Sequence, residues 1–225
     1  MKNRLLKIIK IGKKEYMENL LNKGELYLNT AKYYRKHENE QIGDSHENDF
    51  LIRHGKISIK INDEYIYLYN KHRPIAFSNP NDNKNLYCTY GVFTGNFVKK
   101  EHYMLHEIPN YLIKEFGGTI VCIINPIEFF KRIEVAVKEK GLETQIGHVE
   151  YYNEDTYDGD LTIFNKRKQF SHQNEVRIAI NNENDAPIKL NIGSINDIAL
   201  ILDNKMLKHE FENGEKYIIN PIYNK

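Results

Sequence analysis

Short runs of alternating apolar and polar residues are the feature that most constrains the fold of this chain. The clearest are 56–61 and 65–69, which flank Asn62, Asp63 and Glu64 and predict a β-hairpin. Helical spacing of apolar residues is found mainly at 13–22 and 125–140. Other short runs predict strands at 4–11, 25–29, 86–94, 119–124, 145–152, 187–192 and 198–202. Together these signals predict an α+β fold, with a curved, mostly antiparallel sheet and a few packed helices.

Both main helices carry end signals in the sequence. Gly24 follows the first at a position where glycine ends many helices. The second begins with Asn125, a good N-cap residue, and Pro126, which is favoured at the first helical position. No internal repeat or linker divides the chain, so we expect a single domain over residues 1–225 with a substantial core.

Composition narrows the class of protein. Hydrophobic residues make up 40% and charged residues 28%, with a formal net charge of +1, which is typical of a soluble globular protein. A near-neutral charge argues against a protein that wraps along a nucleic-acid backbone. We interpret the 16 tyrosines as codon bias rather than as a stacking surface.

The N-terminus and the cysteines indicate a cytoplasmic protein. The apolar run within residues 1–11 is broken by Lys7 and Lys10, so it fits neither a signal peptide nor a membrane span, and we expect no membrane contact. Cys88 and Cys122 lie in apolar, strand-like runs, which predicts buried free thiols in a reducing compartment.

The segment 170–178 is the strongest candidate for a site. If it is a strand, Gln173, Glu175 and Arg177 share one face, just after the basic run 166–168. A carboxylate that binds a sugar 2-hydroxyl favours the positive charge that develops as a glycosidic bond breaks. We therefore predict Glu175 as a catalytic residue and Gln173 as the group that orients an acceptor. Arg177 would either keep Glu175 ionised or contact a phosphate. The alternative is a solvated strand face with cross-strand ion pairs.

A polar loop at 43–49 offers a second chemistry. Asp44, His46, Glu47 and Asp49 are ligands that hard divalent cations accept, which would suit a metal-dependent nuclease. The spacing is not that of an EF-hand, and most acidic loops are solvated. We therefore expect no metal, and no effect of chelators on the fold.

Several segments together resemble a widespread group of uncharacterised bacterial and phage proteins. They are the Lys-rich first strand with the run 24–30, the run 34–36 with Asp44 and Glu47, Lys168 with the pattern Phe-x-x-Gln-x-Glu-x-Arg from Phe170 to Arg177, and the run 192–198. The likeness covers nearly the whole chain. Relatives of such proteins are often found among phage-defence and toxin genes, which is context by analogy only.

Two shorter segments resemble ADP-ribosyltransferases. One is the Gln-x-Glu spacing, in which the second acid acts on the nicotinamide ribose, and the other is the strand–helix–Gly–strand opening. The resemblance implies NAD as cosubstrate. It assigns Lys7 or Lys10 to the NAD ribose, at the place where the family has His or Arg, unless Arg4 supplies that residue. The pocket lining that it implies is Tyr27, Asn29 and Thr30.

The leading hypothesis is therefore an ADP-ribosyltransferase-like enzyme that modifies a macromolecule, protein or nucleic acid, in phage–host conflict. One rival is a non-catalytic inhibitor or binding protein, and another is the metal-dependent nuclease. A cleft that joins Glu175 to Tyr27 and Asn29 would favour the enzyme, whereas a structural ion pair over Glu175 would favour the binding protein. We expect Glu175 to be partly buried, so that Glu175→Gln costs within about 1 kcal/mol of stability.

Overall fold

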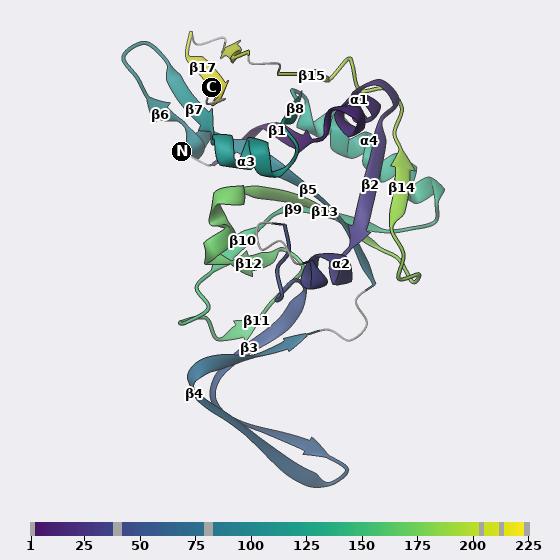
Figure 1. Ribbon diagram of the computed structural model, residues 1–225, viewed down its shortest axis with the longest axis vertical. Coiled ribbons are helices and arrows are strands. Elements are labelled where there is room, and N and C mark those ends of the chain that lie inside the picture. The colour runs from purple at the N-terminus through teal and green to yellow at the C-terminus, as the bar shows by residue number, and fades with distance from the viewer. Residues whose placement is uncertain (1–2, 38–41, 79–82, 203–204, 212–213, 223–225) are drawn as a thin grey trace.

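The computed structural model describes residues 3–37, 42–78, 83–202, 205–211 and 214–222. Strands predominate, helices are few, and most strand pairs are antiparallel, which confirms the predicted α+β class (Figure 1). Among the described residues, no helix combines the length and the apolar character that crossing a bilayer would need.

The largest sheet has eight strands. Six follow the order β14-β2-β5-β1-β8-β15, while β13 pairs with β5 and β9 pairs with β13, all antiparallel. The bounds of these strands are β1 (Leu5–Gly12), β2 (Glu25–Thr30), β5 (Lys84–Phe93), β8 (Thr119–Ile123), β9 (Thr144–His148), β13 (Glu175–Asn181), β14 (Ile188–Asn191) and β15 (Ala199–Ile201).

Two helices cover this sheet because each buries one apolar stripe. Helix α1 (Lys14–Lys23) buries Met17 and Leu20, and it ends at Gly24, which has a left-handed backbone with φ of 65°. Helix α4 (Pro126–Glu139) buries Phe129, Ile133 and Val137 in the same cluster, whereas Ile127 in its first turn is exposed. The Asn125 side chain caps α4 by accepting a hydrogen bond from the backbone N–H of Glu128. Both helices match the predicted ones within one residue.

Smaller sheets extend from this core. A four-stranded sheet contains β16 (Leu207–Glu210), β17 (Lys216–Pro221), β7 (Met104–Ile108) and β6 (Val98–Lys99), and a parallel pair contains β10 (Glu150–Tyr152) and β12 (Asn165–Arg167). The remaining short elements are α2 (Ala31–Lys36), η1 (Thr94–Asn96), α3 (Asn110–Glu115), β11 (Gly159–Asp160) and the 3₁₀ segment η2 (Lys168–Gln173).

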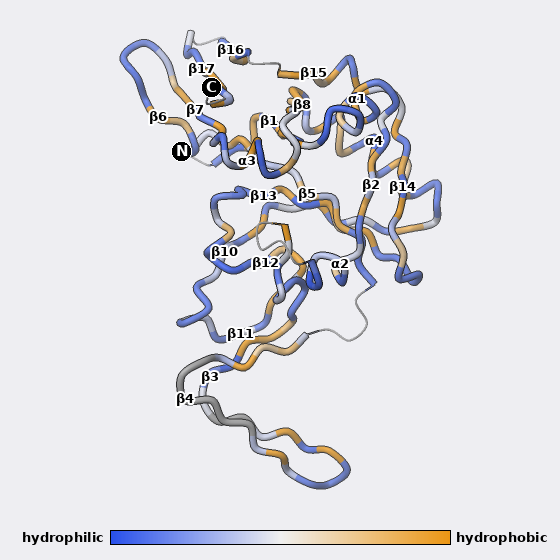
Figure 2. The backbone as a smooth tube through the Cα atoms, in the orientation of Figure 1, coloured by the Kyte–Doolittle hydropathy of each residue, from blue (hydrophilic) through white to orange (hydrophobic). Residues whose placement is uncertain are grey.

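The predicted hairpin is present and much longer than the sequence indicated. Strands β3 (Asp49–Ile61) and β4 (Glu64–Ser78) pair along most of their length and project from the rest of the molecule (Figure 1). Positive φ angles at Asn62 and Asp63 form the tight turn that hairpins prefer. Figure 2 shows hydrophobic segments on the outer part of this hairpin as well as along the central strands.

Two sequence predictions need correction, and one sheet was missed. The segment with Gln173, Glu175 and Arg177 is not one strand, because η2 ends at Gln173 and β13 begins at Glu175. The predicted strand 145–152 is two strands, β9 and β10, that pair with different partners. The four-stranded sheet was not predicted at all, because its strands are short and lack clean alternation.

Candidate functional site

A pocket lies where the central sheet splits. Strand β5 pairs with β2 at Leu86 and with β1 from Tyr90 onward, so Tyr87, Cys88 and Thr89 have no partner strand on that edge. Strands β1 and β2 diverge along this edge of β5, and a cavity of about 200 Å³ opens between them. The side chains around it come from β1, β2, β5, α2, α3 and the segment 166–175, so the topology alone brings these distant parts together.

The backbone just before β13 positions Glu175 at this pocket. Asn174 takes a left-handed conformation with φ of 40°, which turns the chain from η2 into the strand. The Asn174 amide holds this turn by donating hydrogen bonds to the carbonyl of Gly91 and, at 2.8 Å, to Oδ1 of Asn96. The backbone N–H of Glu175 donates to the hydroxyl of Tyr151 at 2.9 Å.

Glu175 belongs to a buried cluster of four charged side chains. Nε of Arg177 is 2.6 Å from Oε1 of Glu175, and Nζ of Lys166 is 3.2 Å from its Oε2. Arg177 also reaches the two carboxylate oxygens of Glu47, at 2.6 and 3.2 Å, from a position 130 residues away in sequence. Glu175 is only 3% exposed and Arg177 0%. The cluster therefore has two acids and two cations, which balance in charge.

The balance keeps Glu175 ionised. Burial by itself raises the pKa of this carboxyl, but the charges of Arg177 and then Lys166 outweigh burial and hold the pKa well below its usual range. For Glu47 burial prevails over Arg177, and its pKa is raised. Burial lowers the pKa of Lys166, yet the neighbouring charges of Glu175 and Glu47 raise it overall. Glu175 is thus the stronger acid of the two, and its charge is paired with those of Arg177 and Lys166.

The structure groups some predicted site residues and separates others. Gln173, Glu175 and Asn29 line the pocket, whereas Arg177 contacts Glu175 from a fully buried position outside the lining. Tyr27 is 53% exposed and lies outside the lining. The Thr30 hydroxyl caps α2 by accepting from the N–H of Tyr33, so Thr30 has a structural contact instead.

The two lysines of β1 line different pockets. Residues 4–7 line one cavity and residues 9–11 line the other, so position along the strand separates the two lysines. Lys10 lines the Glu175 pocket, where its Nζ donates to the carbonyl of Cys88 at 2.7 Å and lies 4.3 Å from the Tyr87 ring centroid. Lys7 lines a second cavity near the other end of β1. Of the two candidates for the family's basic residue, Lys10 is the one that shares a pocket with Glu175.

The expected partial exposure of Glu175 was wrong. Because both of its cationic partners are buried, replacing the carboxylate by an amide leaves a positive charge unmatched in a dry environment. The small stability cost expected for Glu175→Gln therefore does not hold.

The polar loop 43–49 is tied into the fold by ion pairs. Asp44 accepts from Nη2 of Arg167 at 2.7 Å, and Asp49 accepts from Ser78 at 2.6 Å and lies 2.6 Å from Nδ1 of His46. Within the described ranges, no group of three or more His, Cys, Asp or Glu side chains is arranged as metal ligands. Both cysteines are free, and burial raises the pKa of each thiol to about 12.

Several pocket residues were missed from the sequence as members of this site. Glu47 was assigned to a metal loop, and Lys166 was noted only as part of a basic run. The aromatic side chains Tyr33 and Tyr90 were not singled out, and Tyr34 was named only within the run 34–36 of the resemblance. One signal in the sequence was available for Glu47. Glu47 and the Gln-x-Glu-x-Arg pattern both belong to the resemblance to the uncharacterised group, which indicates that these residues act together.

Comparison with family models, with curated proteins and with solved structures gave no match.

Proposed function

We propose that this protein is an ADP-ribosyltransferase-like enzyme that uses NAD and has Glu175 as its catalytic carboxylate. The observation that carries the proposal is that a buried, ionised Glu175 lines a pocket together with Gln173 and Asn29, from opposite parts of the chain. A chain that only maximised its core would fill such a space with apolar side chains. The resemblance noted in the sequence supplies the reaction class.

The state of Glu175 suits the role. Three donors reach its carboxylate, namely Arg177, Lys166 and the thiol of Cys88. A carboxylate accepts about four hydrogen bonds, so capacity for one ligand hydroxyl remains. Its negative charge lies in a low-dielectric setting, where it would stabilise positive charge developing on a bound ribose more strongly than in water. The ion pairs hold the carboxylate in place rather than block it.

The pocket suits one part of a dinucleotide. Its volume of about 200 Å³ is below the range of roughly 300–1,000 Å³ of most small-molecule sites, so a nicotinamide–ribose unit is the part we assign to it. Tyr33, Tyr34 and Tyr90 supply flat walls for a ring, and Lys10 lies where it would meet an anionic group. Gln173, held by Nζ of Lys166 at 2.7 Å, would orient the acceptor.

We propose a macromolecular acceptor, in the cytoplasm and in the setting of phage–host conflict. The test is incubation of the protein with labelled NAD and cell lysate. Wild type should transfer label to a macromolecule and Glu175→Gln should not. The matched control is Asp44→Asn, which also converts a buried, ion-paired acid to its amide but lies outside the pocket lining. Loss of transfer in both variants would show that activity follows stability, and full transfer in Glu175→Gln would refute the catalytic role.

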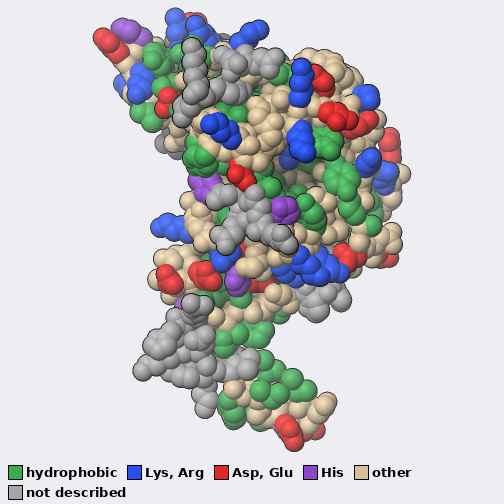
Figure 3. All heavy atoms as spheres, in the orientation of Figure 1, with side chains coloured by type: hydrophobic (Ala, Val, Ile, Leu, Met, Phe, Trp, Pro, Cys, Tyr) green, Lys and Arg blue, Asp and Glu red, His purple; other side chains and the backbone are tan. Residues whose placement is uncertain are grey.

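Two observations favour the rival reading, a non-catalytic binding protein. The carboxylate of Glu175 is paired with Arg177 and Lys166, and Tyr27 lies outside the pocket, which is the arrangement expected of a binding protein. The outer part of the β3–β4 hairpin exposes Ile61, Tyr65, Ile66 and Tyr67, each by at least 46%. Figure 3 shows hydrophobic side chains gathered there, away from the body of the molecule. Exposed apolar groups at such density mark interaction surfaces in many proteins. If wild type transfers no label but Tyr65→Ser with Tyr67→Ser abolishes capture of a partner, the binding protein is the better description.

A further inference from the structure

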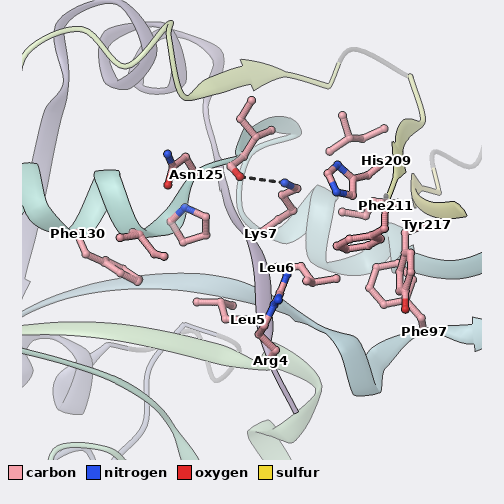
Figure 4. A pocket seen from close by; sticks show the side chains of 15 residues that line it. Arg4, Leu5, Leu6, Lys7, Phe97, Asn125, Phe130, His209, Phe211 and Tyr217 are labelled. Atoms are coloured by element: carbon pink, nitrogen blue, oxygen red, sulfur yellow. Dashed lines mark hydrogen bonds between the residues drawn. The ribbon is translucent and has the colours of Figure 1, made fainter. Parts of the chain in front are cut away.

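A second and larger cavity lies at the beginning of β1. Its volume is about 520 Å³, within the range of ordinary small-molecule sites. Strand β1, the start of α4 and the strands β16 and β17 surround it (Figure 4). It is separate from the Glu175 pocket, and no described residue lines both cavities.

The polar side of this cavity is cationic. Arg4, Lys7 and His209 line it, and its described lining contains no Asp or Glu. Nζ of Lys7 donates to the carbonyl of Ile124 at 2.9 Å, which uses one of its three donors and leaves two for other acceptors. Figure 4 shows Lys7 near the centre of the cavity, with His209 on one side. Positive side chains that share a partly apolar space without an acid attract an anion.

Arg4 and Lys7 act on the third polar group, His209. The pKa of His209 is lowered by burial and then by the positive charges of Lys7 and Arg4, so at about pH 7 His209 is mainly a neutral hydrogen-bond donor. Burial also lowers the pKa of Lys7, and Arg4 lowers it further against the opposing effect of Cys122. Like charges brought together in this way are relieved when an anion binds between them.

The rest of the lining is mostly apolar. An edge-to-face series of rings runs from His209 to Phe211, Tyr217 and Phe97, with successive centroids 4.5, 4.8 and 4.8 Å apart. Phe130 and the leucines of β1 form the opposite wall. The side-chain oxygen of Asn125 is already committed to capping α4. The walls therefore match an apolar body better than a nucleobase, whose polar edges would need partners.

We propose that this cavity binds a small amphipathic anion, with a carboxylate or phosphate head held by Arg4, Lys7 and His209 and an apolar body packed against the ring series. The site is independent of the Glu175 pocket and of the function proposed for that pocket. Its ligand would be an acid such as a medium-chain carboxylate or alkyl phosphate.

The experiment is isothermal titration of the full chain with decanoate, with decyl phosphate and with 1-decanol, each below its solubility or micelle limit. The two anions should bind and the alcohol should bind at least tenfold more weakly, since the alcohol has the chain without the charge. Whichever of the two anions binds with the higher affinity shows whether the site prefers a carboxylate or a phosphate head group. Binding of the anions should weaken as salt is added.

Variants then locate the site. Lys7→Met should weaken anion binding by about tenfold or more, and Arg4→Gln should do the same to a smaller extent. Lys208→Met is the matched control, because it removes the same charge from the neighbour of His209 but is outside the lining. Glu175→Gln should bind decanoate like wild type. If Lys7→Met proves unstable, the Arg4→Gln variant tests the location of the site by itself, because Arg4 is exposed and its replacement should not affect folding.

Three results would overturn the proposal. These are the absence of anion binding, equal binding of decanol and decanoate, and equal weakening by Lys208→Met and the lining variants.

Discussion

The buried cluster of Glu175, Lys166, Arg177 and Glu47 makes a quantitative prediction about coupling. Its two acids and two cations are balanced, and all four side chains are at most 5% exposed. Glu175→Gln leaves a net positive charge in the cluster, and Lys166→Met leaves a net negative one. Breaking a buried pair by removing one partner costs about 3–5 kcal/mol, so each single variant should lose about 3 kcal/mol or more. That is a large share of a total stability of about 5–15 kcal/mol.

The double variant Glu175→Gln with Lys166→Met should lose far less than the sum of the two. Charge balance returns, because the two-point contact between Arg177 and Glu47 remains intact at 2.6 and 3.2 Å. We expect a coupling energy of about 2–3 kcal/mol between the two sites, at the upper end of values for residues in direct contact. The double variant should then be about as stable as either single one.

Urea unfolding followed by far-UV circular dichroism measures all four proteins of this cycle. The slope of free energy against urea should stay constant, so that midpoints report stability directly. Additive losses, within about 0.5 kcal/mol, would refute the reasoning, as would a single variant that loses less than about 1 kcal/mol. Either result would mean that water or local rearrangement neutralises the cluster.

Three further predictions concern single residues or the polar loop. The hydrogen bond to Asp49 raises the pKa of His46 in spite of its burial. The stability from this pair is therefore complete below about pH 6.5 and is lost as pH rises through the folded pKa. The unfolding free energy of wild type minus that of His46→Gln should accordingly be larger at pH 5.5 than at pH 8.5. Gly24→Ala should destabilise far more than Gly193→Ala in thermal melts. Both glycines have a positive φ, which costs an alanine about 1–2 kcal/mol of strain. Only at Gly24 would the new Cβ also clash with backbone, because it would lie 2.0 Å from the carbonyl oxygen of Gly193. EDTA or added Mg²⁺, Mn²⁺ or Ca²⁺ should leave the melting temperature unchanged, because the carboxylates of loop 44–49 already have protein partners; a clear upward shift with a cation would favour the nuclease.

Short sequence signals predicted the helix ends and the hairpin turn, because these features depend on interactions between residues that are close in sequence. The N-cap at Asn125 and the left-handed stop at Gly24 fix both main helices, since backbone geometry near each residue decides the outcome. The turn at Asn62 and Asp63 fixes the hairpin for the same reason. These residues act within a few positions of themselves, so a single sequence suffices to find them.

The site could be predicted only in part, because its geometry is set by distant contacts. Alternation alone would place Gln173 and Glu175 on one strand, but the left-handed turn at Asn174 intervenes, and both still reach the pocket. The pairing of Glu47 with Arg177 depends on how loop and sheet meet across 130 residues. The alternation of residues along β1 likewise cannot tell which of Lys7 and Lys10 shares a pocket with Glu175.

The central position of β5 also has a consequence for how the chain folds. This strand pairs with β1, β2 and β13, so its hydrogen-bonding edges are completed by segments from both halves of the sequence. Loops must close before such pairings gain anything, and domains with predominantly non-local pairing fold in milliseconds to seconds rather than microseconds. During synthesis, β5 emerges long before β13 and exposes an open apolar edge until residue 181 is made. We therefore expect partially synthesised chains to be the species most prone to aggregation.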